Sequence, residues 1–194
     1  MSQLHIRRKS IFIAGTALLG AVVVVLDVTF KTANLKIPFP LFPDLKFDAL
    51  GIPMLLAYLL FGFLSGVITS GIAFLSITLR SGQAFPAFMK FLAEFVTIAG
   101  VYAVLRTRKP SAFEKKWKIL AMISGILLRV AVMDVANVLL LPIFTVYYKT
   151  SEAVILIVPF ISLFNAVQGA VSVFGGFLLY EAVILRLPSL KMNK

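Results

Sequence analysis

Polar and ionisable side chains interrupt the long apolar stretches of this chain, and they are the groups able to bind a ligand or move a proton. Such residues are costly in hydrocarbon, so each one is kept for a function or for a specific pairing. Lys90 and Glu94 carry opposite charges, whereas Asn165 and Gln168 supply amides that both donate and accept hydrogen bonds. The full set is Asp27, Lys90, Glu94, Arg129, Asp134, Asn137, Asn165 and Gln168.

Two pairs among these residues have the spacing of partners on one helix face. Lys90 and Glu94 are four residues apart, a spacing at which opposite charges pair, and this pairing is compatible with a role at a ligand site. Asp27 and Lys31 share the spacing near the end of an apolar stretch. For them we predict a structural ion pair.

The remaining polar residues need partners on other helices. Arg129 and Asp134 are five residues apart, about 140° around a helix, so we expect no direct pair between them. Asn137 follows Asp134 on a similar face. Asn165 and Gln168 are placed either to contact a ligand or to hydrogen-bond a neighbouring helix in the membrane.

The residue types that are missing exclude several classes of enzyme. The chain has no cysteine, and its one histidine, His5, lies in the basic N-terminal segment. Thiol chemistry, disulfides, histidine metal sites and a Ser-His-Asp triad are therefore excluded from the apolar stretches. No stretch matches the phosphate-binding pattern G-x-x-x-x-G-K-S/T. We predict no catalytic residue, no metal and no cofactor.

The composition is that of an integral membrane protein. Apolar residues make up 60% of the 194 positions, charged residues 14%, and the mean hydropathy is +1.01. Soluble domains have about 45–50% apolar and about 25% charged residues. A soluble core of this size cannot hide such a surplus, whereas a bilayer accommodates it.

Positive charge is concentrated beside the apolar stretches. Of the 19 lysines and arginines, three precede the first stretch, six lie between residues 106 and 118, and three lie in the C-terminal tail. This is the distribution that the positive-inside rule produces. The net charge of +11 therefore indicates orientation and contact with anionic lipid, and not a nucleic-acid partner.

The apolar stretches predict an all-α integral membrane protein, a compact bundle of six transmembrane helices in a single domain, residues 1–194. Residues 51–79 are uncharged over a length of about 43 Å as one helix, more than the roughly 30 Å of a hydrocarbon core. Glycines at 62 and 66 favour a turn, so we divide this stretch into two short spans. The predicted spans are about 10–30, 49–62, 65–80, 86–105, 119–141 and 159–185, with an outer loop at 31–48.

The six-span arrangement places both termini in the cytoplasm. A five-span arrangement with the N-terminus outside gives the same charge distribution, and the basic N-terminus and the length of 51–79 favour six. The polar residues then lie mostly in the outer half of the membrane, beneath loop 31–48. This layer predicts a pocket open to the outside, with Phe39, Phe42 and Phe47 as an aromatic lid over a flat ligand.

Small residues form a stripe along the first span. Ser10, Ala14, Ala17 and Ala21 recur at the spacing of one helix face. Such stripes allow close approach of helices in lipid. The approaching helix belongs either to another protein or to the same bundle.

Two segments contain motifs that are similar to those of a known transporter family. Residues 45–53 read LKFDALGIP, which resembles the pattern L-K-Y/F-D-x-x-x-I-P at the entry to a second span. Residues 164–169 read FNAVQG, which resembles F-N-x-V/I-K/Q in a sixth span. Each motif is short, and their order along nearly the whole chain gives them weight.

Two further segments complete the resemblance. Ser81 and Gly82, followed by MKFLA at 89–93, resemble an entry to a fourth span, and Asn137 stands five residues before Pro142, as at the end of a fifth. With six short spans, the proline-containing outer loop and the alanine stripe, the chain resembles the S component of an energy-coupling factor (ECF) vitamin transporter. The riboflavin-binding S components are the most similar.

The resemblance implies a substrate-capture subunit with no catalysis of its own, in the plasma membrane of a prokaryote. It implies that the alanine stripe, Ala14, Ala17 and Ala21, docks a transmembrane coupling subunit, and that separate ATPase subunits hydrolyse ATP. The substrate-binding residues that it and the polar layer predict are Phe47, Asp48, Lys90, Glu94, Asn137, Asn165 and Gln168.

Three positions depart from the riboflavin-binding pattern. A lysine is common where Gln168 stands, an acidic residue where Gly51 stands, and an asparagine where Lys90 stands. An exchange of lysine and glutamine between the fourth and sixth spans either preserves the chemistry of the pocket or marks another vitamin.

Two other classes of protein remain as alternatives. A small secondary transporter or channel would use Glu94 and Asp134 as ion or proton sites. A membrane-embedded enzyme would use the same two carboxyl groups as general acid and base, although no motif of known spacing surrounds them.

Overall fold

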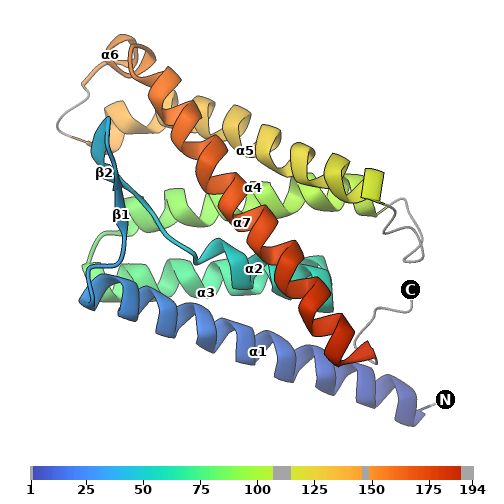
Figure 1. Ribbon diagram of the computed structural model, residues 1–194. Coiled ribbons are helices and arrows are strands. Elements are labelled where there is room, and N and C mark those ends of the chain that lie inside the picture. Colours follow the sequence, from blue (N-terminus) through green and yellow to red (C-terminus); the bar gives the residue numbers. More distant parts are fainter. Residues whose placement is uncertain (1, 107–114, 146–148, 189–194) are drawn as a thin grey trace.

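The computed structural model describes residues 2–106, 115–145 and 149–188, which form a bundle of helices with a short β-hairpin at one end (Figure 1). The elements are α1 (Ser2–Thr32), β1 (Ile37–Phe39), β2 (Phe42–Phe47), α2 (Gly51–Phe61), α3 (Phe63–Ser81), α4 (Ala84–Leu105), α5 (Lys115–Phe144), α6 (Ser151–Ile155) and α7 (Val158–Arg186).

Five of these helices, α1, α3, α4, α5 and α7, are long and apolar enough to cross a membrane. The apolar stretch 51–79 is divided as predicted, and the break falls at Gly62, whose φ of +99° favours glycine. Helix α2 has 11 residues, about 16 Å, and so is too short to cross a hydrocarbon core alone. The prediction of six spans therefore stays a prediction.

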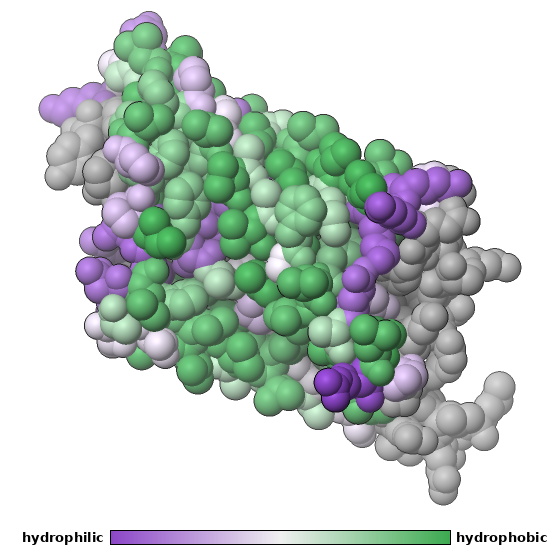
Figure 2. Space-filling view, in the orientation of Figure 1, coloured by the Kyte–Doolittle hydropathy of each residue, from purple (hydrophilic) through white to green (hydrophobic). Residues whose placement is uncertain are grey.

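The ends of the helices separate into two groups (Figure 1). The beginning of α1, the end of α4, the beginning of α5 and the end of α7 lie at one end of the bundle. The hairpin, the α3–α4 connection and α6 lie at the other, which we call the hairpin end. Figure 2 shows a broad hydrophobic face across the middle of the bundle, with hydrophilic residues gathered toward its two ends. The cytoplasmic location of the termini remains a prediction from charge.

Small residues bring α1 close to its neighbours in the bundle. A Cβ atom at Gly15 would lie 2.2 Å from the ring of Phe61, and one at Gly20 would lie 2.5 Å from Ile72. On the same inward face, the hydroxyl groups of Thr16 and Ser65 are 2.7 Å apart. The predicted alanine stripe does not take part in this packing, since Ala14, Ala17 and Ala21 are all exposed.

The predicted outer loop contains the antiparallel hairpin of β1 and β2, which sequence analysis did not foresee. Ile37 pairs with Phe47 and Pro38 with Lys46, and a register shift follows Pro38. A two-stranded sheet consists of edge strands only, where proline is tolerated. The hairpin lies over the beginnings of α4 and α7 and the end of α5, and the segment that follows it leads into α2 (Figure 1).

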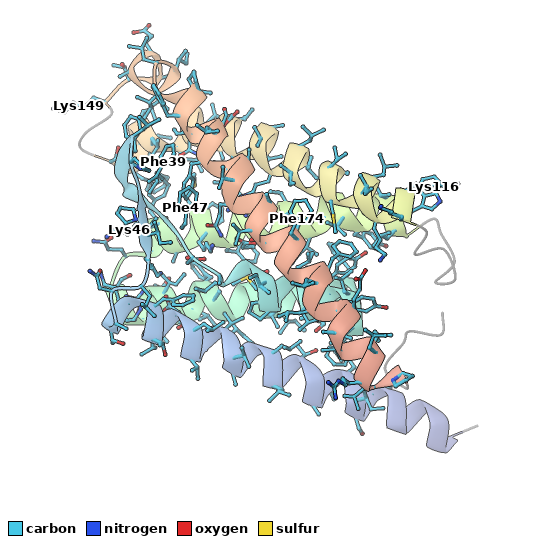
Figure 3. The ribbon with its side chains drawn as sticks, in the orientation of Figure 1. Phe39, Lys46, Phe47, Lys116, Lys149 and Phe174 are labelled. Atoms are coloured by element: carbon cyan, nitrogen blue, oxygen red, sulfur yellow. The ribbon has the colours of Figure 1, made fainter. Side chains whose placement is uncertain are left out.

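Aromatic rings of the hairpin pack against aromatic rings of α7. Phe47 stacks on Phe164 with ring centroids 4.8 Å apart, Phe39 lies 5.8 Å from the same ring, and Phe42 lies 5.7 Å from Phe160. Figure 3 places Phe39, Lys46 and Phe47 together at the hairpin end, whereas Lys116 lies at the opposite end of the bundle. We call residues 37–50 the roof, because they cover the cavity described next.

Candidate ligand-binding site

A cavity of about 340 Å³ lies beneath the roof, between α4, α5 and α7. This volume is within the range of small-molecule sites. Its walls are mainly apolar and aromatic, with a few polar groups among them. The lining residues are Leu45, Lys46, Phe85, Pro86, Met89, Lys90, Ala93, Arg129, Met133, Asn137, Leu141, Thr145, Ile161, Phe164, Asn165 and Gln168.

Helical spacing brings these residues to one place. On α5, Arg129, Met133 and Asn137 recur every four residues and so share one face. On α7, Phe164 and Gln168 are likewise four apart. The apolar members of the lining were missed by sequence analysis, and their spacing from the predicted amides is the signal that identifies them.

Four of the seven predicted binding residues line the cavity, and they are Lys90, Asn137, Asn165 and Gln168. Phe47, Asp48 and Glu94 are not among the described lining residues. Each of these three instead contacts a residue that does line it: Phe47 contacts Phe164, Asp48 contacts Gln168, and Glu94 contacts Lys90.

Four charged side chains form a cluster in the cavity wall, which we call the charged cluster. Lys90 Nζ lies 2.8 Å from Asp48 Oδ1 and 3.0 Å from Glu94 Oε1, as predicted for the i, i+4 pair. Arg129 Nη1 donates to the same Glu94 oxygen at 2.9 Å. The side chains of Glu94 and Arg129 are each only 2% exposed. Because water solvates these buried groups poorly, each charge is stabilised mainly by the opposite charges beside it.

Gly51 makes room for the carboxylate of Glu94. A Cβ atom at position 51 would lie 2.3 Å from Glu94 Oε2 and 2.0 Å from Ser172 Oγ. The first residue of α2 therefore packs directly against the charged cluster. Any larger side chain there would have to displace Glu94 or Ser172.

Gln168 attaches the end of the roof to α7 through two hydrogen bonds. Its Nε2 donates to the carbonyl of Asp48 at 2.8 Å, and its Oε1 accepts from the backbone N–H of Asp48 at 3.1 Å. The Asp48 carboxylate in turn accepts from the N–H of Leu50. A single side-chain amide thus satisfies backbone groups that have no strand or helix partner at this point.

The two asparagines are held by their own helices. Asn165 Nδ2 donates to Ile161 O, which leaves its Oδ1 to accept from Arg129 Nε at 3.2 Å. Asn137 Nδ2 donates to Met133 O at 2.7 Å. No donor within the described residues reaches Asn137 Oδ1, so this oxygen is placed to accept a hydrogen bond from a ligand in the cavity.

Asp27 belongs to a second cluster, outside the described cavity lining. It is fully buried and accepts from Arg80 Nε at 2.9 Å and from Ser76 at 3.2 Å, while Lys36 lies 3.4 Å away. The predicted pair with Lys31 is wrong, because Lys31 is exposed and the partners are residues of α3 and Lys36, which immediately precedes the roof.

Asp134 lies apart from the charged cluster. Its Oδ2 accepts from Ser162 at 2.6 Å, and it faces a separate, open groove between α5, α6 and α7. The expectation that Arg129 and Asp134 have different partners is confirmed. Glu94 and Asp134, the two carboxylates of the ion-transport and enzyme alternatives, thus take part in separate sets of contacts.

Comparison with known proteins identifies the family. The family model for the substrate-specific component of ECF transporters matches residues 12–180. The chain belongs to this family. A solved structure of the S component of a bacterial ECF transporter is similar over 92% of this chain and 98% of that one, with 26% sequence identity and a TM-score of 0.76. No curated protein sequence matches the chain.

Membership in the family establishes the general role. ECF S components are integral membrane proteins that bind a substrate and act with ECF coupling and ATPase subunits, and they are not enzymes. The cavity beneath the roof is the candidate substrate site of this S component. Family membership therefore favours substrate capture over the secondary transporter, channel and enzyme alternatives.

Proposed function

We propose that this S component captures an aromatic vitamin from outside the cell, with riboflavin as the first candidate. The cavity opens on the outer side of a prokaryotic plasma membrane, and both termini lie in the cytoplasm. The bound vitamin passes inward through a separate coupling subunit powered by ATPases.

The observation that carries this proposal is the lining of the cavity. Phe85 and Phe164 supply aromatic surface, and Met89 and Met133 supply adaptable apolar surface for a flat ring system. The amides of the lining supply donors and acceptors for the polar edge of such a ring. Burial of apolar area gives affinity, while a few placed polar groups fix orientation.

The motifs of the sequence support riboflavin in particular. The segments 45–53 and 164–169, which resemble the riboflavin-binding S components, both contribute to the cavity wall or to its roof. The departure at Gln168 is paired with the departure at Lys90. Both side chains contact Asp48, so a cation and an amide remain together at this point of the wall.

The alanine stripe of α1 is the proposed docking face for the coupling subunit. Its residues are exposed, whereas the glycines beside them pack into the bundle, so the stripe is available to a partner. Replacing Ala17 and Ala21 together by leucine should abolish co-purification with the coupling subunit and leave vitamin binding intact. Ala131→Leu on the exposed face of α5 is the matched control. Continued assembly of the double variant would refute the docking role.

The ligand is tested by purifying the chain alone in detergent and recording its visible absorption spectrum. A flavin spectrum at near one ligand per chain is the expected result, with riboflavin released on denaturation. A colourless protein that releases another vitamin would reassign the pocket. If no vitamin is released and none binds when added, the capture of an aromatic vitamin is wrong.

A single substitution tests the position of the site. Asn165→Ala removes a lining amide and the acceptor of Arg129 Nε, and it should weaken vitamin binding by about tenfold while the protein still folds. Val167→Ala, an exposed position on the opposite face of the same turn, is the control. Unchanged affinity of Asn165→Ala would remove that residue from the site.

A further inference from the structure

The charges of the charged cluster cancel. Lys90 and Arg129 contribute two positive charges, and Asp48 and Glu94 contribute two negative ones, all within one set of contacts between 2.8 and 3.0 Å. All four side chains are at least 85% buried, since the most exposed, Lys90, is 15% exposed. Water therefore screens these charges poorly, and their sum determines the field that a ligand experiences.

The two cations and the two carboxylates of the charged cluster are placed differently relative to the cavity. Lys90 and Arg129 line the cavity, whereas neither carboxylate is among the described lining residues. The N–H groups of the two cations are thus available to a ligand, while Asp48 and Glu94, outside the described lining, balance their charges. One oxygen, Glu94 Oε1, accepts from both cations and makes Glu94 the centre of the cluster.

One further cation contacts the charged cluster. Lys36 Nζ lies 3.8 Å from Asp48 Oδ2, but it is closer to Asp27 Oδ1, at 3.4 Å, and so joins the charged cluster to the second cluster. Lys36 and Arg80 leave that second cluster with one positive charge in excess, and neither of them is among the described lining residues. Glu94 has Lys90 and Arg129 as its cationic partners, so its charge is used within the charged cluster alone. Lys46 lines the cavity from the roof and is exposed, so solvent screens its charge.

We infer that Glu94 and Asp48 are positioning residues that determine specificity: by cancelling Lys90 and Arg129 they make the site retain the uncharged form of its ligand and reject its phosphate ester. A phosphate that enters this wall loses its hydration, and the two cations that it meets there, Lys90 and Arg129, are already paired with carboxylates. An uncharged ligand can still accept hydrogen bonds from the N–H groups of Lys90 and Arg129. This inference rests on the proposed capture of riboflavin.

The test compares the affinities of riboflavin and of flavin mononucleotide, its phosphate ester, by quenching of flavin fluorescence in purified protein freed of ligand. The wild type should prefer riboflavin by at least about tenfold. Glu94→Gln leaves one net positive charge in the cluster. Acting on a phosphate about 10 Å away at an effective dielectric constant of about 20–40, this charge should shift the preference toward the ester by about tenfold or more.

Further variants separate charge from folding. Asp48→Asn makes the same change of charge at the roof and should shift the preference in the same direction. Lys90→Met combined with Glu94→Gln restores neutrality and should return the ratio of affinities to within about twofold of the wild type. Ser172→Ala, which removes a 3.5 Å contact with Glu94 but no charge, should leave it unchanged. The ratio does not depend on how much of each preparation is folded.

The outcomes distinguish this inference from the proposed function. If the wild type binds riboflavin but binds its phosphate equally well, or if the ratio is the same in Glu94→Gln and Asp48→Asn as in the wild type, the inference is overturned and riboflavin capture stands. If the wild type binds neither flavin, the proposed ligand is overturned and the inference with it.

Discussion

Gln168 joins the end of the roof to α7 by hydrogen bonds to both the N–H and the carbonyl of Asp48, and its replacement by leucine tests whether the roof closes the cavity. The substitution introduces an apolar side chain of similar size and removes both hydrogen bonds to the backbone of Asp48, of 2.8 and 3.1 Å. The aromatic contacts of Phe47 and the ion pair of Lys90 with Asp48 remain, so we expect the helices to stay folded.

The size of the effect follows from the number of bonds lost. Each intramolecular hydrogen bond contributes about 0.5–1.5 kcal/mol net, so closure of the roof should lose about 1–3 kcal/mol. This corresponds to an increase of about fivefold to about 150-fold in the population with an open roof. The bound substrate should leave faster by a similar factor.

Hydrogen exchange measured by mass spectrometry on peptides covering residues 45–50 gives the direct assay. It is made on protein without ligand, because Gln168 lines the cavity and direct contacts with the vitamin would otherwise contribute. Ser172→Ala, one turn further along the same face of α7, is the control and should exchange like the wild type at 45–50. If Gln168→Leu also exchanges like the wild type there, the reasoning about the roof is refuted.

Three further substitutions have expected outcomes. Gly51→Ala would place a Cβ atom 2.3 Å from Glu94 Oε2, so substrate affinity measured by calorimetry should fall by about tenfold, and an unchanged affinity would contradict the close packing of Gly51 against Glu94. Gly62→Ala forces alanine to a φ of +99° with no new contact, so unfolding in detergent should cost about 1–2 kcal/mol less while substrate affinity is retained. Asp27→Asn removes the carboxylate that Arg80 contacts and leaves Lys36 with Asp48 alone, 3.8 Å away, so it should lower stability by about 2 kcal/mol or more. Lys31→Met should not, and equal effects of the two would argue against the partners identified.

The features that could be predicted from the sequence are those set by local spacing. Lys90 and Glu94 pair because four residues make slightly more than one helical turn, and this holds whatever surrounds the helix. The break in 51–79 was predicted because one helix of this length is longer than the hydrocarbon core is thick, and Gly62 stands at the break. Four of the predicted binding residues line the cavity because polar residues in hydrocarbon must face the bundle interior.

The features that could not be predicted depend on which helix faces which. Arg129 reaches Glu94 across 35 residues, and Asp48 reaches Gln168 across 120. Periodicity gives the inward face of a helix but not the identity of the helix opposite. Asp27 shows the consequence. A partner four residues away in sequence was predicted, but Lys31 is exposed, and the partners are Arg80 on α3 and Lys36 in the segment after α1. The hairpin was missed because prolines at 38, 40 and 43 obscure the alternation of a strand.

The short length of α2 has a consequence for how such a protein evolves. Helix α2 begins only at Gly51, and the segment before it, the roof, is one contiguous stretch of chain that covers the cavity. The exposed alanines of α1 belong to a different stretch. Mutations in the roof can therefore change which molecule is retained without altering the proposed docking face of α1. Selection can therefore change substrate specificity and the docking of partner subunits separately within one protein.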